Sequence, residues 1–75
     1  MNDNENLKSS ESQNAQILAW LENGNKITQL DALKLFGCFR LSSRIFDLRE
    51  RGFEIDTKRV KTNTGKWICE YSLKI

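Results

Sequence analysis

The sequence predicts a single small α+β domain, in which three helices and a short strand precede a two-stranded β-hairpin. Two observations predict this class. Apolar residues recur with helical spacing up to Gly52, whereas from Phe53 onward they alternate with polar residues as in strands. Gly24, Gly37 and Gly65 fall between these segments, where turns are needed. A chain of 75 residues is long enough for one core only.

The first twelve residues, MNDNENLKSSES, differ in composition from the rest of the chain. They are polar and rich in Asn, Ser and Glu, so they bury too little apolar surface to offset the entropy that ordering would cost. We therefore expect residues 1–12 to form a disordered N-terminal tail and residues 13–75 to form the folded domain. The alternative is a short arm that becomes ordered on a partner.

A short first helix is expected from Gln13 to Asn23. Ser10 or Ser12 can accept a hydrogen bond from the free amide groups at its start. Its apolar residues form a broad stripe, which is more typical of a helix that packs than of one that binds a ligand. Trp20 within this stripe is expected to be a core residue, with a ligand platform as the alternative.

The second helix is expected to begin at Thr28, after a short extended segment at Lys26 and Ile27 that could pair at the edge of a sheet. Asp31, three residues after Thr28, completes a capping-box pattern. Gly37 ends the helix. The apolar residues expected to be buried are Leu30, Leu33 and Phe36, whereas Leu35 lies off their face.

A third helix is predicted from Phe39 to Arg51, and Gly52 follows as its C-terminal cap. The turn before it is so short that the second and third helices must cross steeply, as in a helix-turn-helix. Its apolar residues recur at spacings of four and three, so they share one side of the helix. These residues are Leu41, Ile45 and Leu48. Phe46 lies at the edge of this side and is expected to pack under the later strands.

The opposite side of the third helix is free, and arginines lie at its flanks. Arg44, Arg49 and Arg51 are placed where a guanidinium can reach a phosphate or the edge of a base. This pattern predicts a DNA-recognition helix. For Arg49 and Arg51 there is an alternative, because cations in the last turn also stabilise the negative end of the helix dipole.

Two strands are predicted after Gly52, because apolar and polar residues now alternate. The turn signal between them is Asn63-Thr64-Gly65. Val60 is out of phase with the apolar residues before it, which suggests a bulge or a strand that leaves the core. Phe53 and Ile55 share one face of the first strand, and one face of the second strand carries Trp67, Cys69, Tyr71 and Leu73.

The residues around this turn are basic and polar, and no acidic residue occurs from 57 to 69. A basic hairpin that extends past the core is well placed to lie along a phosphate backbone. The alternative is that its lysines only prevent edge-to-edge pairing. The residues that could contact DNA here are Lys58, Arg59, Lys61, Asn63 and Lys66.

The net charge of +2 is too small to indicate a nucleic-acid partner by itself, but its distribution is uneven. Residues 1–37 contain three Lys and five acidic residues, a net charge of −2, and residues 38–75 contain nine Lys or Arg and five acidic residues, a net charge of +4. This asymmetry is compatible with a basic face in the second half. A chance excess on a solvated surface is the alternative.

The composition argues against metal, membrane and enzymatic functions. The chain has no histidine, and its two cysteines, Cys38 and Cys69, cannot form a structural zinc site alone. No apolar run approaches the roughly 20 residues of a membrane span, and the N-terminus lacks the pattern of a signal peptide. We expect a cytoplasmic protein without cofactor or small-molecule substrate, in which both thiols are reduced core residues. An enzyme is not expected, because the usual nucleophile and base pairs are missing.

The order helix, short strand, helix, turn, helix and two-stranded hairpin is that of the winged helix-turn-helix. The segment ITQLDALKLFGCFRLSSRIFDLRERGFEI resembles small helix-turn-helix proteins of phages and prophages, in which a threonine-led helix, an FGC-type turn and an R-I-x-D-L-R-x-R-G helix recur. This resemblance covers about residues 15–73. A looser resemblance to the N-terminal winged-helix domain of biotin repressors runs through Ile45, Leu48, Arg49, Gly52 and the closing Tyr71-Ser72-Leu73.

The resemblance implies that exposed residues of the third helix enter the major groove of DNA, with the hairpin tip beside it. These residues are Arg40, Ser42, Ser43, Arg44 and Asp47, followed by Lys61, Asn63 and Lys66. Arg40 and Arg44 would bind guanine or clamp phosphate, and the two serines would donate to phosphate or base. Asp47 would repel phosphate, so it either accepts from a cytosine amine or, as we favour, forms a salt bridge with Arg44, Arg40 or Arg51.

The sequence therefore predicts binding of double-stranded DNA, by a phage or prophage regulator or accessory factor. The alternative is a winged-helix module that binds another protein and does not contact DNA directly. Such a module would expose Leu35, Phe39 or Phe46 in one apolar patch. A domain this small is expected to need a second copy or a protein partner at a specific site.

Overall fold

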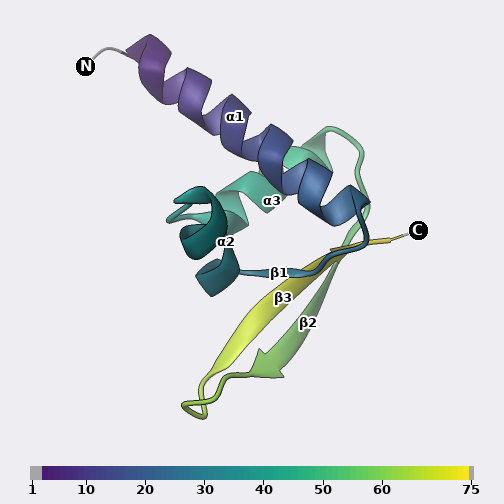
Figure 1. The fold of residues 1–75 in the computed structure, drawn as a ribbon. Coiled ribbons are helices and arrows are strands. Elements are labelled where there is room, and N and C mark those ends of the chain that lie inside the picture. The colour runs from purple at the N-terminus through teal and green to yellow at the C-terminus, as the bar shows by residue number, and fades with distance from the viewer. Residues whose placement is uncertain (1–2, 75) are drawn as a thin grey trace.

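In a computed structural model, three helices pack around one end of a three-stranded antiparallel sheet, and the hairpin of that sheet projects away from them (Figure 1). The structure describes the backbone of residues 3–74 and the side chains of residues 11–74. The elements in chain order are α1 (Asp3–Glu22), β1 (Ile27–Thr28), α2 (Gln29–Phe36), α3 (Leu41–Glu50), β2 (Ile55–Lys61) and β3 (Trp67–Leu73). This order and sheet confirm the predicted α+β fold of a winged helix-turn-helix.

Helix α1 is longer than the sequence predicts. It begins at Asp3, not at Gln13, so Ser10 and Ser12 lie inside it and do not cap it. Residues 3–12 are therefore helical where their composition predicts a disordered tail, and the rest of that tail, residues 1–2, lies outside the described residues. The physical reason is that extending an existing helix gains one hydrogen bond for each residue fixed, and the segment contains no Gly or Pro that would stop it.

The start and end of α2 are set by local chemistry, as predicted. The backbone amide of Asp31 donates to Thr28 Oγ1 at 3.2 Å, and the amide of Thr28 donates to Asp31 Oδ2 at 3.1 Å, which is a complete capping box. Gly37 closes the helix with φ 62° in the left-handed region. Its amide donates to the carbonyl of Leu33 at 3.0 Å.

The turn from α2 to α3 is held by one amide side chain. Gln29 Nε2 donates to the carbonyl of Cys38 at 2.7 Å, and Gln29 Oε1 accepts from the amide of Leu41 at 2.8 Å. Two backbone groups that the helix termini leave without partners are satisfied in this way. Helix α3 is shorter than the predicted 39–51, since it begins at Leu41 and ends at Glu50.

Strand β3 is the centre of the sheet and pairs with β1 on one side and with β2 on the other. The short extended segment predicted at Lys26 and Ile27 is thus confirmed as an edge strand at Ile27–Thr28. The register of β2 with β3 is unbroken from Ile55 opposite Leu73 to Lys61 opposite Trp67. The predicted bulge at Val60 is therefore wrong.

Val60 is out of phase with Ile55 because the two side chains lie on opposite faces of a regular strand. It lies opposite Ile68. The predicted turn is confirmed as a three-residue loop, in which the amide of Thr62 donates to the carbonyl of Lys66 at 2.7 Å. Gly65, at φ 85°, takes the left-handed position that such loops require.

The core lies where α1, α3 and the base of the sheet meet. Its buried side chains include Ile17, Leu21, Ile27, Ala32, Leu41, Ile45, Leu48 and Ile55. Trp20 packs against this core as predicted, with its indole nitrogen donating to the carbonyl of Lys26 at 3.0 Å and its ring edge-on to Phe36. Cys38 is buried as expected.

Several apolar residues predicted to be buried are exposed. Leu30 and Leu33 are exposed because α2 turns only the side of Ala32 and Phe36 toward the core. Phe46 does not pack under the strands and is 62% exposed, since the centre of the buried side of α3 lies between Leu41 and Leu48. Cys69 is also exposed, and it lies just beyond the part of β3 that pairs with β1, which is Glu70 and Tyr71.

Candidate nucleic-acid interface

The free side of α3 carries few charges. Leu41, Ile45 and Leu48 are buried, so the helix turns Ser42, Phe46 and Glu50 to solvent. Of the predicted contact residues, only Ser42 lies in the middle of this free side. The arginines of α3 lie at the flanks of this side, as the sequence predicts, but the structure gives Arg44, Arg49 and Arg51 partners within the protein.

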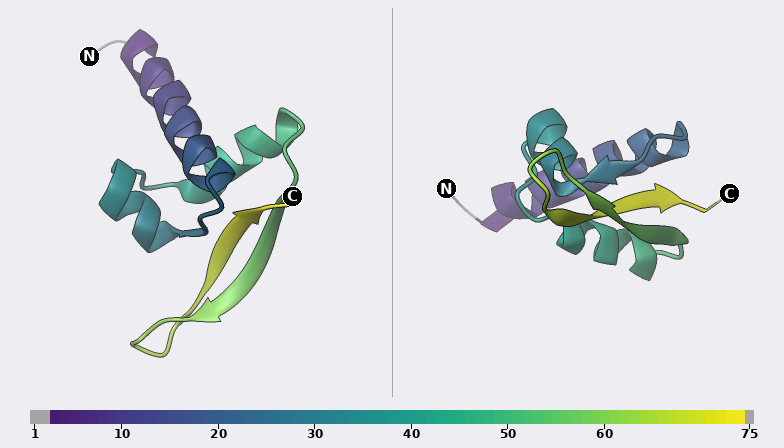
Figure 2. Two further views of the ribbon diagram at one scale, coloured as in Figure 1. Left: turned by 45° about the vertical axis from the view of Figure 1, so that its right-hand side comes forward. Right: turned by 90° about the horizontal axis from the view of Figure 1, so that it is seen from below.

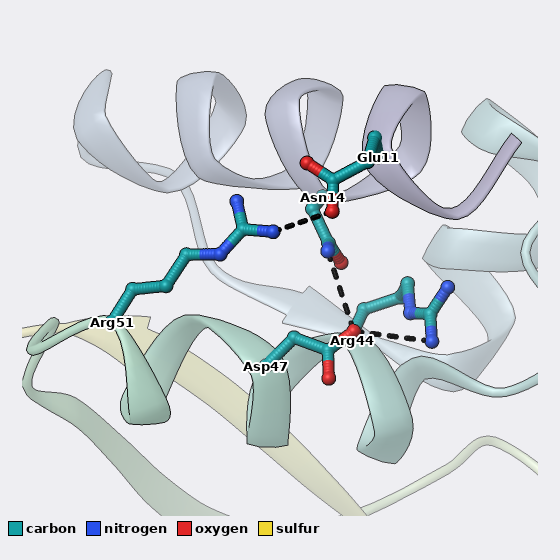
Figure 3. Close-up of polar contacts among 5 residues, drawn as sticks. All are labelled: Glu11, Asn14, Arg44, Asp47 and Arg51. Carbon is teal, nitrogen blue, oxygen red and sulfur yellow. Dashed lines mark hydrogen bonds and ion pairs between the residues drawn. The ribbon is translucent and has the colours of Figure 1, made fainter. Parts of the chain in front are cut away.

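Arg44 and Asp47 form an ion pair on the side of α3 that faces α1 (Figure 3). Arg44 Nη2 lies 3.2 Å from Asp47 Oδ2, and the two side chains are 17% and 37% exposed. The buried Asn14 of α1 donates from Nδ2 to the same Oδ2 at 3.3 Å. The salt bridge favoured for Asp47 is therefore confirmed with Arg44 as its partner. Both side chains lie against α1, away from the free side of α3.

Arg51 is also drawn toward α1. Its Nη2 lies 2.6 Å from Glu11 Oε1, and Figure 3 shows the guanidinium reaching across from the end of α3. Together with the contact of Asn14 to Asp47, this pair ties the two helices at two points. The guanidinium of Arg51 therefore contacts α1, and the predicted sharing of a DNA surface with the hairpin finds no support in this contact.

Arg40 and Ser43 line a polar pocket of about 340 Å³ at the start of α3. Arg40 is exposed at the N-cap position, and Ser43 is half-buried. The other residues around the pocket are Gln13, Gly37, Phe39 and Arg44. The structure thus brings together three of the predicted contact residues, Arg40, Ser43 and Arg44, on the α1 side of α3.

The predicted contact residues of the hairpin divide between its two faces. By the register and the alternation of the strands, Arg59 and Lys61 lie on the face that also carries Trp67, whereas Lys58 lies on the other face, opposite Glu70. Asn63 belongs to the exposed turn, and Lys66 follows it. Seen from below, the hairpin lies between α2 on one side and α3 on the other (Figure 2).

The contacts of Arg49 show which face of the hairpin adjoins α3. Arg49 donates from Nε and Nη2 to the carbonyl of Ile55, at 3.2 and 2.6 Å, and from Nη2 to Thr57 Oγ1 at 2.8 Å. Its guanidinium lies 5.9 Å from the ring centroid of Tyr71. Thr57 and Tyr71 share a face with Arg59 and Lys61, so this face continues toward α3.

The pKa of Tyr71 is affected by its surroundings in this cluster. Its pKa is raised, chiefly because burial disfavours the phenolate and further because of the neighbouring Cys69, while Arg49 acts in the opposite direction. The sequence did not predict this cluster, since it gave Arg49 only a DNA contact or a helix-dipole role. Arg49 precedes Ile55 by six residues. No local sequence pattern predicts that an arginine will bind a strand carbonyl at this spacing.

The α3–wing surface is the name used below for the free side of α3 together with the Arg59 face of the hairpin. Within residues 11–74, the ion pairs are Arg44 with Asp47 and Arg51 with Glu11. Five other predicted contact residues have no ionic partner there: Arg40, Lys58, Arg59, Lys61 and Lys66. Of these, Arg59 and Lys61 lie on the α3–wing surface. Arg40 lies on the α1 side of α3, and Lys66 lines a pocket with Gln29 and Leu30 of α2. This is the electrostatic pattern of a surface that attracts a polyanion.

Among the described residues, no group of three or more His, Cys, Asp or Glu side chains is placed to hold a metal ion. Across the same part of the chain, no helix has the length and apolar character needed to cross a membrane.

A helix-turn-helix followed by a basic hairpin defines a class of DNA-binding domain. The family model of the winged helix-turn-helix domain matches residues 12–74, and the chain belongs to this family. Comparisons with curated proteins and with solved structures find no match. The family supports DNA binding in general.

Proposed function

We propose that the protein binds double-stranded DNA through the α3–wing surface. The observation that carries this proposal is the placement of Arg59 and Lys61 on the hairpin face that Arg49 joins to α3. These two cations have no ionic partner among residues 11–74, and no acidic residue occurs from 57 to 69. Phosphates of a duplex attract unpaired cations of this kind and release counterions on binding.

In this proposal α3 approaches the major groove and the hairpin follows the phosphate backbone. Ser42 would donate to a base edge or a phosphate, and Arg40 at the start of α3 would bind phosphate. Lys66 and Asn63 at the hairpin tip would contact the backbone. Lys58 contributes only long-range attraction, because it lies on the opposite face of the hairpin.

Sequence preference is expected to be modest. The arginine best suited to bind guanine, Arg44, is held by Asp47 and is only 17% exposed. The free side of α3 offers Ser42, Phe46 and Glu50, of which only Ser42 favours contact with DNA. Most of the affinity should therefore come from phosphate contacts. With four unpaired cations, the log–log slope of affinity against salt should be about −4.

The test is a titration of a fluorescent mixed-sequence duplex at low salt, repeated at rising salt. A variant with both Arg59→Ala and Lys61→Ala should bind at least tenfold more weakly at low salt, with a salt slope smaller by about two. The matched control is Lys26→Ala with Lys34→Ala, which removes the same charge from exposed positions outside the α3–wing surface. Equal losses in the two double variants would contradict the proposal, because only net charge would then matter.

A second candidate function rests on exposed apolar side chains. Leu30, Leu33 and Leu35 of α2 are 59%, 42% and 48% exposed, and Phe39 in the following turn is 80% exposed. Exposed apolar residues gathered on one helix are typical of a surface that binds protein. Absence of duplex binding at low salt, with a folded protein, would favour this function over the first.

The biological role is proposed from sequence likeness alone. We infer a cytoplasmic regulator or accessory factor of a phage or prophage, which binds its site as two copies or together with a protein partner. A single small domain with about four phosphate contacts binds weakly, and a second copy would raise the effective affinity. Analytical ultracentrifugation with and without DNA tests this expectation, since a lone monomer on DNA would contradict it.

A further inference from the structure

Trp67 is a large apolar side chain that the core does not use. It is the first residue of β3 and is 57% exposed, in contrast to Trp20, which packs against the core and donates a hydrogen bond. Its strand partner is Lys61, whose Nζ lies 6.0 Å from the centroid of the indole ring. Trp67 and Arg59 together line a shallow cavity of about 290 Å³ on the surface.

The charges around Trp67 all have one sign. Arg59 and Lys61 lie on the same face of the hairpin, and the nearest acidic residue along the strand, Glu70, lies on the opposite face. An indole between two cations presents a flat apolar surface with positive charge beside it. A nucleotide has the complementary chemistry, because a planar base is attached to a negatively charged phosphate.

Paired bases cannot use such a site. In a duplex the faces of each base are covered by the neighbouring base pairs, so only phosphates and base edges are available. An unpaired base has a free face, and it stacks on an aromatic side chain whatever its sequence. A site made of Trp67 and two cations therefore distinguishes unpaired from paired bases, and it does not distinguish one base sequence from another.

We propose that Trp67, Arg59 and Lys61 form a stacking site for one unpaired base, so that the protein prefers DNA in which a duplex continues into a single strand. The base stacks on the indole within the cavity beside Arg59, and its phosphate is bound by Lys61. Duplex DNA occupies the part of the α3–wing surface nearest α3, while the single strand reaches Trp67 at the turn end of the hairpin. This inference rests on the proposed DNA binding and names the kind of DNA that the same surface takes.

The test compares three labelled DNAs: a blunt duplex, the same duplex with a short single-stranded overhang, and the overhang strand alone. The overhang should raise the affinity of the duplex about tenfold, which is the order expected for one stacked base. Trp67→Ala should remove this gain, so that this variant binds the overhang and blunt duplexes equally, whereas Trp67→Phe should retain most of it. Leu35→Ala, which shortens an exposed apolar side chain outside the surface, should have no effect.

Tryptophan fluorescence provides a readout that does not depend on affinity. Stacking of a base on Trp67 should quench the emission of the protein on the overhang DNA and not on the blunt duplex. The chain has two tryptophans, so Trp67→Phe supplies the signal of Trp20 alone. Circular dichroism of each variant shows that loss of binding does not reflect loss of folding.

The outcomes separate this inference from the proposed function. Equal affinity for the blunt and overhang duplexes, with no effect of Trp67→Ala, would overturn the stacking site and leave DNA binding intact. A Trp67→Ala variant that binds both duplexes more weakly by the same factor, and so keeps the preference for the overhang, would also overturn it, because Trp67 would then contact paired DNA only. Failure of the folded protein to bind any of the three DNAs at low salt would overturn both proposals.

Discussion

The guanidinium of Arg49, in the last turn of α3, donates two hydrogen bonds to the backbone carbonyl of Ile55, at the first residue of β2. A third hydrogen bond reaches Thr57 Oγ1 at 2.8 Å. A single side chain thus joins the helix to the base of the hairpin. The forked, planar guanidinium fixes both the distance and the angle between them. In a domain that uses α3 and the hairpin together, this contact positions one binding element against the other.

Arg49→Lys should separate charge from geometry at this contact. The variant keeps the positive charge but cannot make the forked contact with Ile55 and Thr57, so we expect a loss of about 1–2 kcal/mol in the free energy of unfolding. Urea unfolding followed by circular dichroism measures this loss. DNA affinity should fall several-fold although the charge is unchanged. Lys34→Arg, an exposed exchange on α2, is the control. Unchanged stability and affinity in Arg49→Lys would show that Arg49 does not position the hairpin.

Asp47→Ala should affect stability more than DNA specificity. The carboxylate accepts from Asn14 and pairs with Arg44, and its removal leaves the buried Asn14 amide without that partner. We expect a loss of about 1–3 kcal/mol in the free energy of unfolding, measured by urea titration. Glu50→Ala, on the exposed side of the same helix, should change stability by less than about 0.5 kcal/mol. A changed base preference at constant stability would instead favour contact of Asp47 with cytosine.

Gly37→Ala should lower the stability of the domain through backbone strain alone. Gly37 has φ 62°, and a Cβ added there meets no heavy atom within 4 Å. The cost is therefore the strain of the left-handed conformation, about 1–2 kcal/mol. Gly37→Asn should cost less, because asparagine tolerates this conformation better. Thermal unfolding of the two variants checks the order, and equal stability of Gly37→Ala and the native chain would contradict it.

Tyr71 should make the fold sensitive to alkaline pH. Its pKa lies above the ordinary tyrosine value of about 10, chiefly because burial disfavours the phenolate. Above pH 10 the unfolded chain has released this proton while the folded chain retains it, so stability is fully present below pH 10 and falls as the pH rises further. Tyr71 is the single tyrosine of the chain, so its absorbance titration is unambiguous. Tyr71→Phe should reduce this loss of stability, and an equal loss in the variant would assign it to other groups.

The contact between α1 and α3 explains why the sequence misplaced part of the DNA surface. Arg44 and Arg51 have the same helical setting as arginines that bind DNA. The pair of Arg44 with Asp47 could be predicted from their spacing of three residues within α3. The contacts of Asn14 with Asp47 and of Glu11 with Arg51 depend instead on how α1 lies across α3. Glu11 belongs to the segment that the composition assigns to a disordered tail, so no local pattern could have linked it to Arg51.

The sequence by itself determined the features that depend on neighbours along the chain. The capping box of Thr28 and Asp31, the left-handed Gly37, the hairpin loop ending at Gly65 and the apolar repeats of α1 and α3 are all encoded within a few residues. Such features follow from hydrogen bonding and steric limits of the local backbone. They were sufficient for the order of elements and hence for the winged helix-turn-helix fold.

Only the tertiary structure decided which side chains remain free to bind. It holds the Arg44–Asp47 pair against α1, pairs Arg51 with Glu11 of α1, commits Arg49 to the base of the hairpin, and leaves Arg59 and Lys61 beside an exposed Trp67. It also leaves Phe46 and Cys69 in solvent. The physical reason is that burial and ion pairing depend on distances between elements that are far apart in sequence, and periodicity within one helix or strand carries no information about those distances.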